Sequence, residues 1–350
     1  MTNPLVFDGH NDVLSKLHRV GGVGEANTFI SGRDGHIDIE RAKSGGFGGG
    51  FFAIYVPSPI DFDSVYEEMS KPQYDLPLPE EISCADALPV VLEQAAILFE
   101  LEKIGGLKIC TSVDEIKTCM SNNTIAAIMH MEGAEAIDPD FHSLEVLYNA
   151  GLRSIGPVWS RPTIFGDGVP FRFPSDGDIG PGLTEHGTNL VKRCNEMGIM
   201  VDLSHLNEAG FWDVAKHSYA PLVATHSNCH AITPHARNLT DKQLAAIAES
   251  DGMVGLNFAV AFLREDGRML TDVPLSQMLR HIDYLLEHLG ENRVGLGSDF
   301  DGAELPDDIA DAAGLVNLRT AMRAHGYDEQ LLKKLCHDNW LRVLEKTWGN

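Results

Sequence analysis

Five residues of types that bind divalent metal ions follow short apolar runs at widely separated points of the chain. Histidine and carboxylate side chains suit a borderline ion such as zinc. Structural zinc sites usually have four protein ligands, whereas catalytic sites keep one position open for water. A carboxylate has two oxygens, so one acidic residue could bridge two ions and create two three-ligand sites. The five candidates are His10, Asp12, Glu132, His205 and His226, with Glu132 as the shared ligand.

A sixth acidic residue, Asp299, also follows an apolar run and is the candidate catalytic residue. Two metal ions about 3.5–4 Å apart can share a hydroxide and clamp a polarised carbonyl. A carboxylate beside that hydroxide could accept its proton and pass it to a leaving amine. The chain has no His-Glu-x-x-His helix, no Gly-x-Ser-x-Gly elbow and no Walker loop. Metal-dependent hydrolysis is therefore the chemistry that the residue types favour.

The apolar runs before these residues predict strands, and three more runs bring the candidates to eight. Helical patterns lie between many of them; one has apolar residues at three- and four-residue spacing from Leu275 to Leu289 and stops at Gly290. Alternating strands and helices predict a parallel sheet, and eight units favour an α/β fold closed as a (β/α)8 TIM-type barrel. Its strand C-termini would meet at one face, where the active site lies. The predicted strands cover residues 5–7, 50–56, 125–129, 152–158, 199–201, 222–225, 253–258 and 294–297.

Two segments interrupt this alternation, at residues 57–81 and 160–182. Both are rich in proline, and each follows a predicted strand. We expect both to leave the barrel at its C-terminal face, where long loops usually shape substrate access; an oligomer contact or a plain surface loop is the alternative. No linker or internal repeat is visible, so residues 1–350 are predicted to form one domain.

The bulk composition narrows the choice of partners and location. With 27 Lys and Arg against 51 Asp and Glu, the net charge is -24. Such a surface repels nucleic acid and anionic membranes, so we expect neither as a partner. No apolar run approaches the roughly 20 residues that span a bilayer, and no signal-peptide pattern is visible. Six scattered cysteines without a CxxC pair fit a reducing, cytoplasmic location.

Several segments resemble the renal (membrane) dipeptidase family, zinc metallopeptidases of the amidohydrolase superfamily. They occur in family order over nearly the whole chain. The membrane anchor and disulfides of the animal enzymes find no counterpart, so the closer likeness is to a bacterial-type soluble member. The matching segments are Asp8-Gly9-His10-Asn11-Asp12, Glu132-Gly133, Asp202-Leu203-Ser204-His205, His226-Ser227, Arg237-Asn238 and Gly297-Ser298-Asp299-Phe300-Asp301-Gly302.

The resemblance implies a barrel enzyme with two zinc ions per chain that cleaves dipeptides by means of a metal-bridging hydroxide and tolerates a D-residue on the C-terminal side. His10 and Asp12 would hold one ion, and His205 and His226 the other. Asp299 would shuttle the proton. Arg237 would bind the C-terminal carboxylate of the substrate, since a guanidinium fork matches a carboxylate. The expected partner is a small-molecule dipeptide, and a homodimer is compatible with the family. The residues given these roles are His10, Asp12, Glu132, His205, His226, Asp299 and Arg237.

One departure from the family concerns Trp159, which occupies the position of a histidine in the animal enzymes. An indole can donate one hydrogen bond but cannot become cationic. Trp159 could still contact the substrate, Arg161 could take over that contact, or Trp159 could only pack against the wall of the site. Two other functions stay open: another binuclear-metal hydrolase, such as a lactonase or an acyl-amino-acid amidase, and a catalytically silent dipeptide-binding protein.

Overall fold

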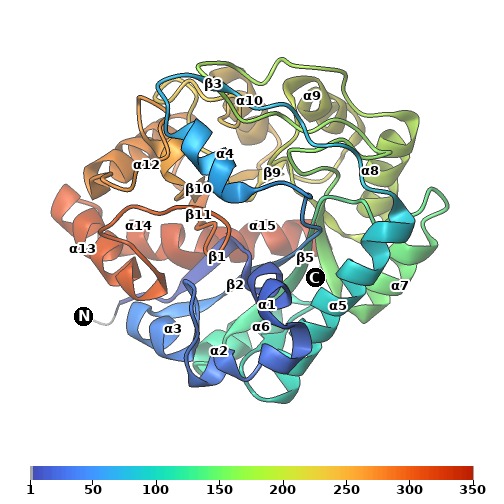
Figure 1. Ribbon diagram of the computed structural model, residues 1–350. Coiled ribbons are helices and arrows are strands. Elements are labelled where there is room, and N and C mark those ends of the chain that lie inside the picture. Colours follow the sequence, from blue (N-terminus) through green and yellow to red (C-terminus); the bar gives the residue numbers. More distant parts are fainter. Residues whose placement is uncertain (1–2, 350) are drawn as a thin grey trace.

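In the computed structural model, which describes residues 3–349, parallel strands form a barrel surrounded by helices (Figure 1). Eight strands follow one another around the barrel in chain order. The ring closes where β1 pairs with β11, and where the single bridge between Asp202 and Val223 joins the ends of β8 and β9. This confirms the predicted (β/α)8 barrel. The barrel strands are β1 (Val6–Asn11), β2 (Phe47–Tyr55), β5 (Ala126–Glu132), β6 (Leu152–Gly156), β8 (Met200–Val201), β9 (Val223–Ala224), β10 (Met253–Asn257) and β11 (Val294–Gly297).

Burial on both faces explains why these strands read as nearly continuous apolar runs. Every residue of β1, β2, β5, β10 and β11 is buried. The register of β2 and β5 runs from Gly49 opposite Ala126 to Tyr55 opposite Glu132. The apolar run itself ends at Met129, and β5 continues to Glu132, as expected for a ligand at a strand end, with β2 paired alongside it that far. Glu132 is thereby held on a strand at the rim of the barrel.

A tryptophan from the C-terminal helix closes one end of the barrel. Trp340 on α15 (Asn339–Trp348) is fully buried, and its Nε1 donates to Leu296 O at 3.0 Å. It packs in a cluster with Phe7 and Phe51, whose side chains come from β1 and β2. Close approach requires glycine nearby: a Cβ on Gly9 would lie 2.5 Å from the indole. This apolar plug leaves the opposite end of the barrel for polar groups.

Helices follow most of the barrel strands and cover the outside of the barrel (Figure 1). The predicted helix over 275–289 is confirmed, with Gly290 at its C-cap. Near the C-terminus, a π-helical turn at Lys334–Asp338 separates α14 (Glu329–Lys333) from α15. A short strand, β4 (Lys108–Ile109), pairs beside β5. The helices are α1 (Val13–Val20), α2 (Thr28–Ser31), α3 (Ile39–Gly45), α4 (Phe62–Met69), α5 (Cys84–Lys103), α6 (Val113–Ser121), α7 (His142–Ala150), α8 (Glu185–Met197), α9 (Glu208–His217), α10 (Asp241–Glu249), α11 (Val260–Leu263), α12 (Leu275–Leu289), α13 (Leu315–His325), α14 (Glu329–Lys333) and α15, with 3-10 turns at Gly22–Glu25 and Ala312–Gly314.

The two excursions, residues 57–81 and 160–182, are joined to each other. The first contains α4 and the short strand β3 (Tyr74–Asp75), so it is more ordered than the predicted loop. The second contains β7 (Arg172–Phe173), which pairs antiparallel with β3. In Figure 1, α4 crosses in front of the barrel, on the side opposite α15. The excursions therefore form part of a cover over the C-terminal face.

Candidate metal centre

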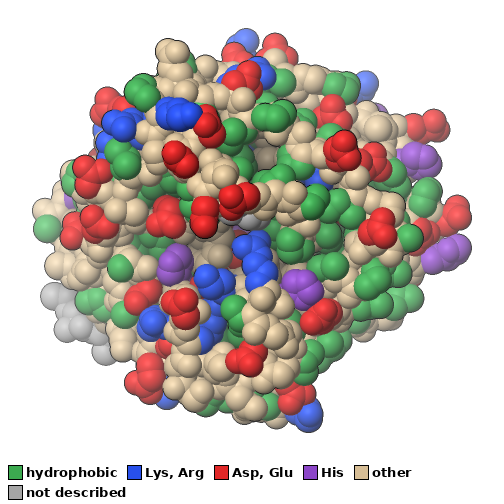
Figure 2. All heavy atoms as spheres, viewed as in Figure 1, with side chains coloured by type: hydrophobic (Ala, Val, Ile, Leu, Met, Phe, Trp, Pro, Cys, Tyr) green, Lys and Arg blue, Asp and Glu red, His purple; other side chains and the backbone are tan. Residues whose placement is uncertain are grey.

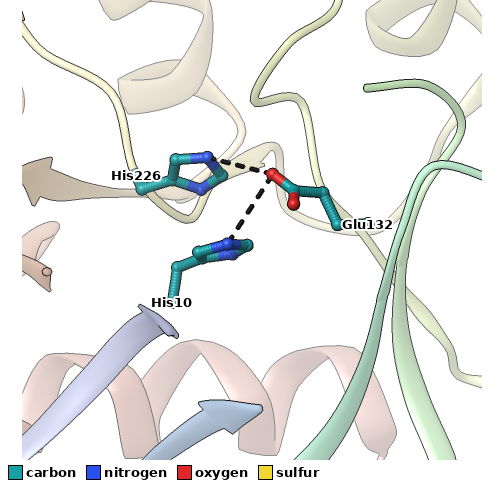
Figure 3. Close-up of side chains that lie close together, drawn as sticks. All are labelled: His10, Glu132 and His226. Atoms are coloured by element: carbon teal, nitrogen blue, oxygen red, sulfur yellow. Dashed lines mark ion pairs between the residues drawn. The ribbon is translucent and has the colours of Figure 1, made fainter. Parts of the chain in front are cut away.

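Three of the predicted ligands converge on one carboxylate oxygen of a fourth, Glu132. Glu132 Oε1 lies 3.0 Å from His205 Nε2, 3.5 Å from His226 Nε2 and 3.6 Å from His10 Nε2. His10 is on β1 and Glu132 ends β5, whereas His205 and His226 follow β8 and β9. Figure 3 shows the imidazoles of His10 and His226 both directed at Glu132. The barrel brings these residues together because parallel strands end at one face.

The donor set fits metal ions. The Nε2 atoms of His205 and His226 lie 3.1 Å apart. Asp12 Oδ2 lies 3.3 Å from His10 Nε2, and neither ring nitrogen of the fully buried His10 has a hydrogen-bond partner among the described residues. Leaving buried polar atoms unpaired costs about 1–3 kcal/mol each. Metal ions coordinated by these nitrogens and oxygens would remove that cost, and histidine with carboxylate is a set that zinc accepts.

Burial and neighbouring charges set the protonation of this cluster. Burial alone would lower the pKa of His10, but the carboxylates of Glu132 and Asp12 outweigh it and raise the pKa to about 10. Burial lowers the pKa of His205 and His226 well below the ordinary value, and nearby Arg237 and His10 lower it further. The two imidazoles are therefore neutral near pH 7, the form that binds metals.

Asp299 lies beside this cluster, after β11. Its backbone is left-handed with φ +60°, and its N–H donates to His10 O at 3.0 Å. One oxygen accepts a hydrogen bond from Asn257 Nδ2 at 3.0 Å. Burial raises the pKa of Asp299. Sequence reasoning did not single out Asn257, although a polar residue at the end of the apolar run 253–257 was a usable signal.

A cavity of about 410 Å³ opens above the cluster, and Glu132, His205 and Asp299 line it. Figure 2 shows acidic and basic side chains around the centre of this face. The excursions supply part of the wall, through Tyr66 of the first and Phe171 of the second. The cavity therefore combines the polar cluster with apolar walls, as ligand sites usually do. Its other lining residues include Asp12, Lys16, Arg19, His36, Tyr55, Met69, Trp159 and Phe262.

The structure places Trp159 in the wall of this cavity. The indole lies 5.2 Å from the ring of Tyr55 and 5.6 Å from that of Phe171, measured between centroids. It also lies 5.7 Å from the imidazole of His205. Packing against the wall, one of the two roles expected for Trp159, is thus what the geometry shows, and contact with the substrate stays a prediction.

Arg161 is not among the residues that line the cavity, and its expected contact with the substrate stays a prediction. Its guanidinium is fully buried and donates to Glu135 Oε1 from Nε at 3.0 Å and from Nη2 at 2.6 Å. It also donates to Ser58 Oγ at 2.6 Å and Val56 O at 2.9 Å. All three guanidinium nitrogens therefore donate hydrogen bonds. Glu135 comes from the segment after β5, whereas Ser58 and Val56 come from the segment after β2. Arg161 links the segments that follow β2, β5 and β6.

Arg237 lies behind the two histidine ligands. It is 4% exposed, and its Nε, Nη1 and Nη2 contact His205 Nδ1 at 3.1 Å, Ser227 Oγ at 3.2 Å and His226 O at 3.2 Å. Burial lowers the pKa of Arg237 to about 10, so the side chain stays cationic at neutral pH. Arg237 is not among the residues that line the cavity, and its expected binding of the substrate carboxylate stays a prediction.

Comparison with known proteins decides the family. The sequence model of the membrane dipeptidase family, peptidase family M19, matches residues 1–348. The chain belongs to the membrane dipeptidase family. A metallopeptidase of Rhodobacter sphaeroides, solved with a phosphinate mimic of the dipeptide L-Ala-D-Ala, is 55% identical with a TM-score of 0.97, covering 99% of this chain and 100% of that one.

Two further relatives agree with this assignment. The solved structure of dipeptidase AC, a metallopeptidase of family M19, is 54% identical with a TM-score of 0.97, and the match covers 100% of both chains. A curated Klebsiella pneumoniae protein, described as an uncharacterized protein in the pqqA 5' region, is 49% identical over 75% of this chain and 98% of its own length. As a member of the family, the protein is a metal-dependent hydrolase that acts on the peptide bond of dipeptides. Despite the family name, none of the helices among residues 3–349 is long and apolar enough to cross a membrane.

Proposed function

We propose that this dipeptidase uses two zinc ions held by His10, Asp12, Glu132, His205 and His226. The observation that carries the proposal is the convergence of three imidazole Nε2 atoms within 3.0–3.6 Å of Glu132 Oε1. His10 and Asp12, which lie 3.3 Å apart, form one candidate pair of ligands. His205 and His226 form the other pair, and Glu132 would be the ligand that the two ions share. When bound, the ions would supply Lewis acidity that polarises the substrate carbonyl and activates a water molecule.

Asp299 is proposed to move the proton in this reaction. Burial raises its pKa, which makes the carboxylate a better proton acceptor than an exposed one. The hydrogen bond from Asn257 to one oxygen leaves the other oxygen of Asp299 available for the proton. Asp299 also lines the cavity. It would take a proton from the attacking water and deliver it to the leaving amine.

The substrate is proposed to be a free dipeptide, with a D-residue tolerated on the C-terminal side. Arg237 is the cation proposed to recognise the terminal carboxylate, because a guanidinium fork matches two carboxylate oxygens. Support for the stereochemistry comes from the Rhodobacter sphaeroides enzyme, which is 55% identical and was solved with a mimic of L-Ala-D-Ala. A cavity of about 410 Å³ has room for such a small molecule.

The test combines metal counting with a stereochemically complete dipeptide panel. The purified protein is loaded with zinc, and elemental analysis should find two ions per chain. All four L and D combinations of a dipeptide such as Ala-Ala are then assayed beside N-blocked, C-amidated and lactone controls. We expect hydrolysis of the L-L and L-D forms and little activity on the blocked substrates. Preferential cleavage of the blocked amides or of the lactones would overturn the dipeptidase proposal.

We also propose that the whole chain is one domain that works in the cytoplasm. The barrel strands run from Val6 to Gly297, and the helix that carries Trp340 returns to plug the barrel, so both ends of the chain belong to one core. All six cysteines are free, which suits a reducing compartment.

A further inference from the structure

We propose that Asp202 and Thr225 are positioning residues that keep Nε2 of His226 free for a metal ion. The proposal rests on the role of His226 as a zinc ligand. Asp202 follows β8, and Thr225 immediately precedes His226. Both side chains are buried, at 1% and 0% exposure, and neither belongs to the ligand set. They lie on the far side of the His226 ring from Glu132, where they contact its Nδ1 edge.

The hydrogen bonds of Asp202 fix the donor and acceptor roles in a chain of hydrogen bonds that runs from Asp202 through Thr225 to His226. Asp202 Oδ1 accepts from the backbone N–H of Ser204 at 3.0 Å and of Thr225 at 2.9 Å. Asp202 Oδ2 lies 2.6 Å from Thr225 Oγ1. An ionised carboxylate can only accept, so the hydroxyl proton of Thr225 points at Asp202. The hydroxyl then has only lone pairs left for its other neighbour.

That other neighbour is Nδ1 of His226, 2.8 Å from Thr225 Oγ1. Since the hydroxyl accepts there, Nδ1 carries the proton of the neutral imidazole. Nε2 therefore presents its lone pair towards Glu132 and His205. With the proton on Nε2 instead, the single hydroxyl proton of Thr225 would have to serve both short contacts. Either the contact with Asp202 or the contact with Nδ1 of His226 would then lack a hydrogen. Hydrogen bonds of this kind orient metal-binding histidines and raise their basicity, and their loss typically weakens metal binding about 10–100-fold.

The geometry makes Asp202→Asn a directional test. The side-chain oxygen of the new asparagine would keep the hydrogen bonds from the backbone N–H groups of Ser204 and Thr225. Its Nδ2 would then face Thr225 Oγ1 and donate to it. The hydroxyl would then donate to Nδ1 of His226 and favour the tautomer with the proton on Nε2. Thr225→Val removes the hydroxyl at nearly constant volume, whereas Thr225→Ser keeps it. We therefore expect Asp202→Asn to weaken metal binding at least as much as Thr225→Val.

The experiment measures zinc stoichiometry and affinity by chelator competition for the wild type and the three variants. We expect Thr225→Val and Asp202→Asn to bind one of the two ions about 10–100-fold more weakly, with Thr225→Ser close to the wild type. Circular dichroism verifies that each variant is folded. Affinity equal to the wild type in Thr225→Val would overturn the proposal. So would an equal loss in Thr225→Ser, since packing and not the hydroxyl would then be responsible.

A second measurement separates this proposal from the proposed function. In metal-free wild-type protein labelled with 15N-histidine, NMR reads the tautomer of His226 directly, and His226→Gln assigns its signals. The proton should reside on Nδ1 in the wild type and shift towards Nε2 in Asp202→Asn. A proton on Nε2 in the wild type would refute the hydrogen-bond chain even if zinc binds. Wild-type protein that binds no zinc would instead refute the metal centre. The tautomer of His226 is measured without metal, so that outcome would not change the test of the hydrogen-bond chain.

Discussion

The Nε2 atoms of His205 and His226 lie 3.1 Å apart, although the two histidines follow different strands of the barrel. Burial holds the pKa of both imidazoles well below the ordinary value. Two neutral imidazoles that both direct Nε2 at Glu132 bring two nitrogen ligands to one carboxylate, an arrangement that suits a zinc ion. This pair therefore gives the sharpest tests of the centre.

Replacing one member of the pair should remove one ion and leave the other. We expect His226→Ala to lower the zinc content from two ions to one and to abolish most of the turnover. Elemental analysis and a dipeptide assay measure the two effects. His186→Ala on exposed α8 is the matched control and should change neither. A His226→Ala protein that still binds two ions tightly would remove His226 from the ligand set.

Asp299→Asn should separate metal binding from proton transfer. The amide keeps the size of the side chain and can no longer accept a proton as a base. Since general acid–base catalysis contributes about 10²–10⁴-fold, kcat should fall by that factor while two zinc ions remain bound. Steady-state kinetics and metal analysis on the same sample check this. A kcat near that of the wild type would exclude Asp299 as the proton shuttle.

Arg237→Lys should weaken recognition of the substrate carboxylate. Lysine keeps the positive charge but loses the planar fork that binds two oxygens at once. We expect KM for free dipeptides to rise about tenfold, which is about 1.4 kcal/mol of binding free energy. The preference for a free over an amidated C-terminus, measured as a ratio of kcat/KM values, should fall in parallel. An unchanged ratio would mean that another group reads the carboxylate.

Arg161→Met should destabilise the fold without a direct effect on substrate binding. It leaves the carboxylate of Glu135 buried and unpaired, and breaking such a pair costs about 3–5 kcal/mol. Urea unfolding of the zinc-free proteins measures the loss. Arg280→Ala breaks the surface pair with Glu265 and serves as the comparison, at about 0–1 kcal/mol. Equal losses in the two variants would contradict the structural role of Arg161.

The stability of the protein should fall below about pH 6.5 partly because of His281, a buried residue of α12 away from the ligands. Burial lowers its pKa to about 4, and its Nδ1 accepts from Cys229 N–H. The unfolded chain binds this proton below about pH 6.5, whereas the folded chain does not until about pH 4. The contribution of His281 to the free energy of unfolding is thus fully present above about pH 6.5 and is lost as the pH falls towards 4.

Urea midpoints at pH 7 and pH 5 measure this loss, with His281→Gln for comparison. We expect a smaller decline between the two pH values in the variant than in the wild type, because glutamine takes up no proton. Identical declines would show that His281 does not contribute to the acid sensitivity.

The sequence predicted the barrel strands and the ligands because one physical rule covers both. Strands buried on two faces read as apolar runs, so a charged residue within a few positions after such a run stands out. Glu132 and Asp299 were found in this way, and the structure places both in the cluster. Pairing between strands was harder to predict. The register that sets Tyr55 of β2 opposite Glu132 of β5 joins distant segments, and no local pattern of residues 130–132 reveals it.

Contacts between distant segments account for what the sequence analysis missed. The sequence pattern offers Arg161 as an alternative substrate contact, but it does not reveal the hydrogen bonds to Glu135, Ser58 and Val56, which come from other loops. The pairing of Tyr74 with Phe173 joins segments about a hundred residues apart, so residues 57–81 and 160–182 looked like independent loops. The local amino-acid composition carries no information about such contacts between distant segments.

The joined excursions have a consequence for how enzymes of this architecture diverge. The reacting groups lie at the ends of the barrel strands, whereas part of the cavity wall comes from the two appended segments. Selectivity can therefore drift while the chemistry is preserved. Because β3 and β7 are hydrogen-bonded to each other, we expect a change of length beside one strand to shift the other.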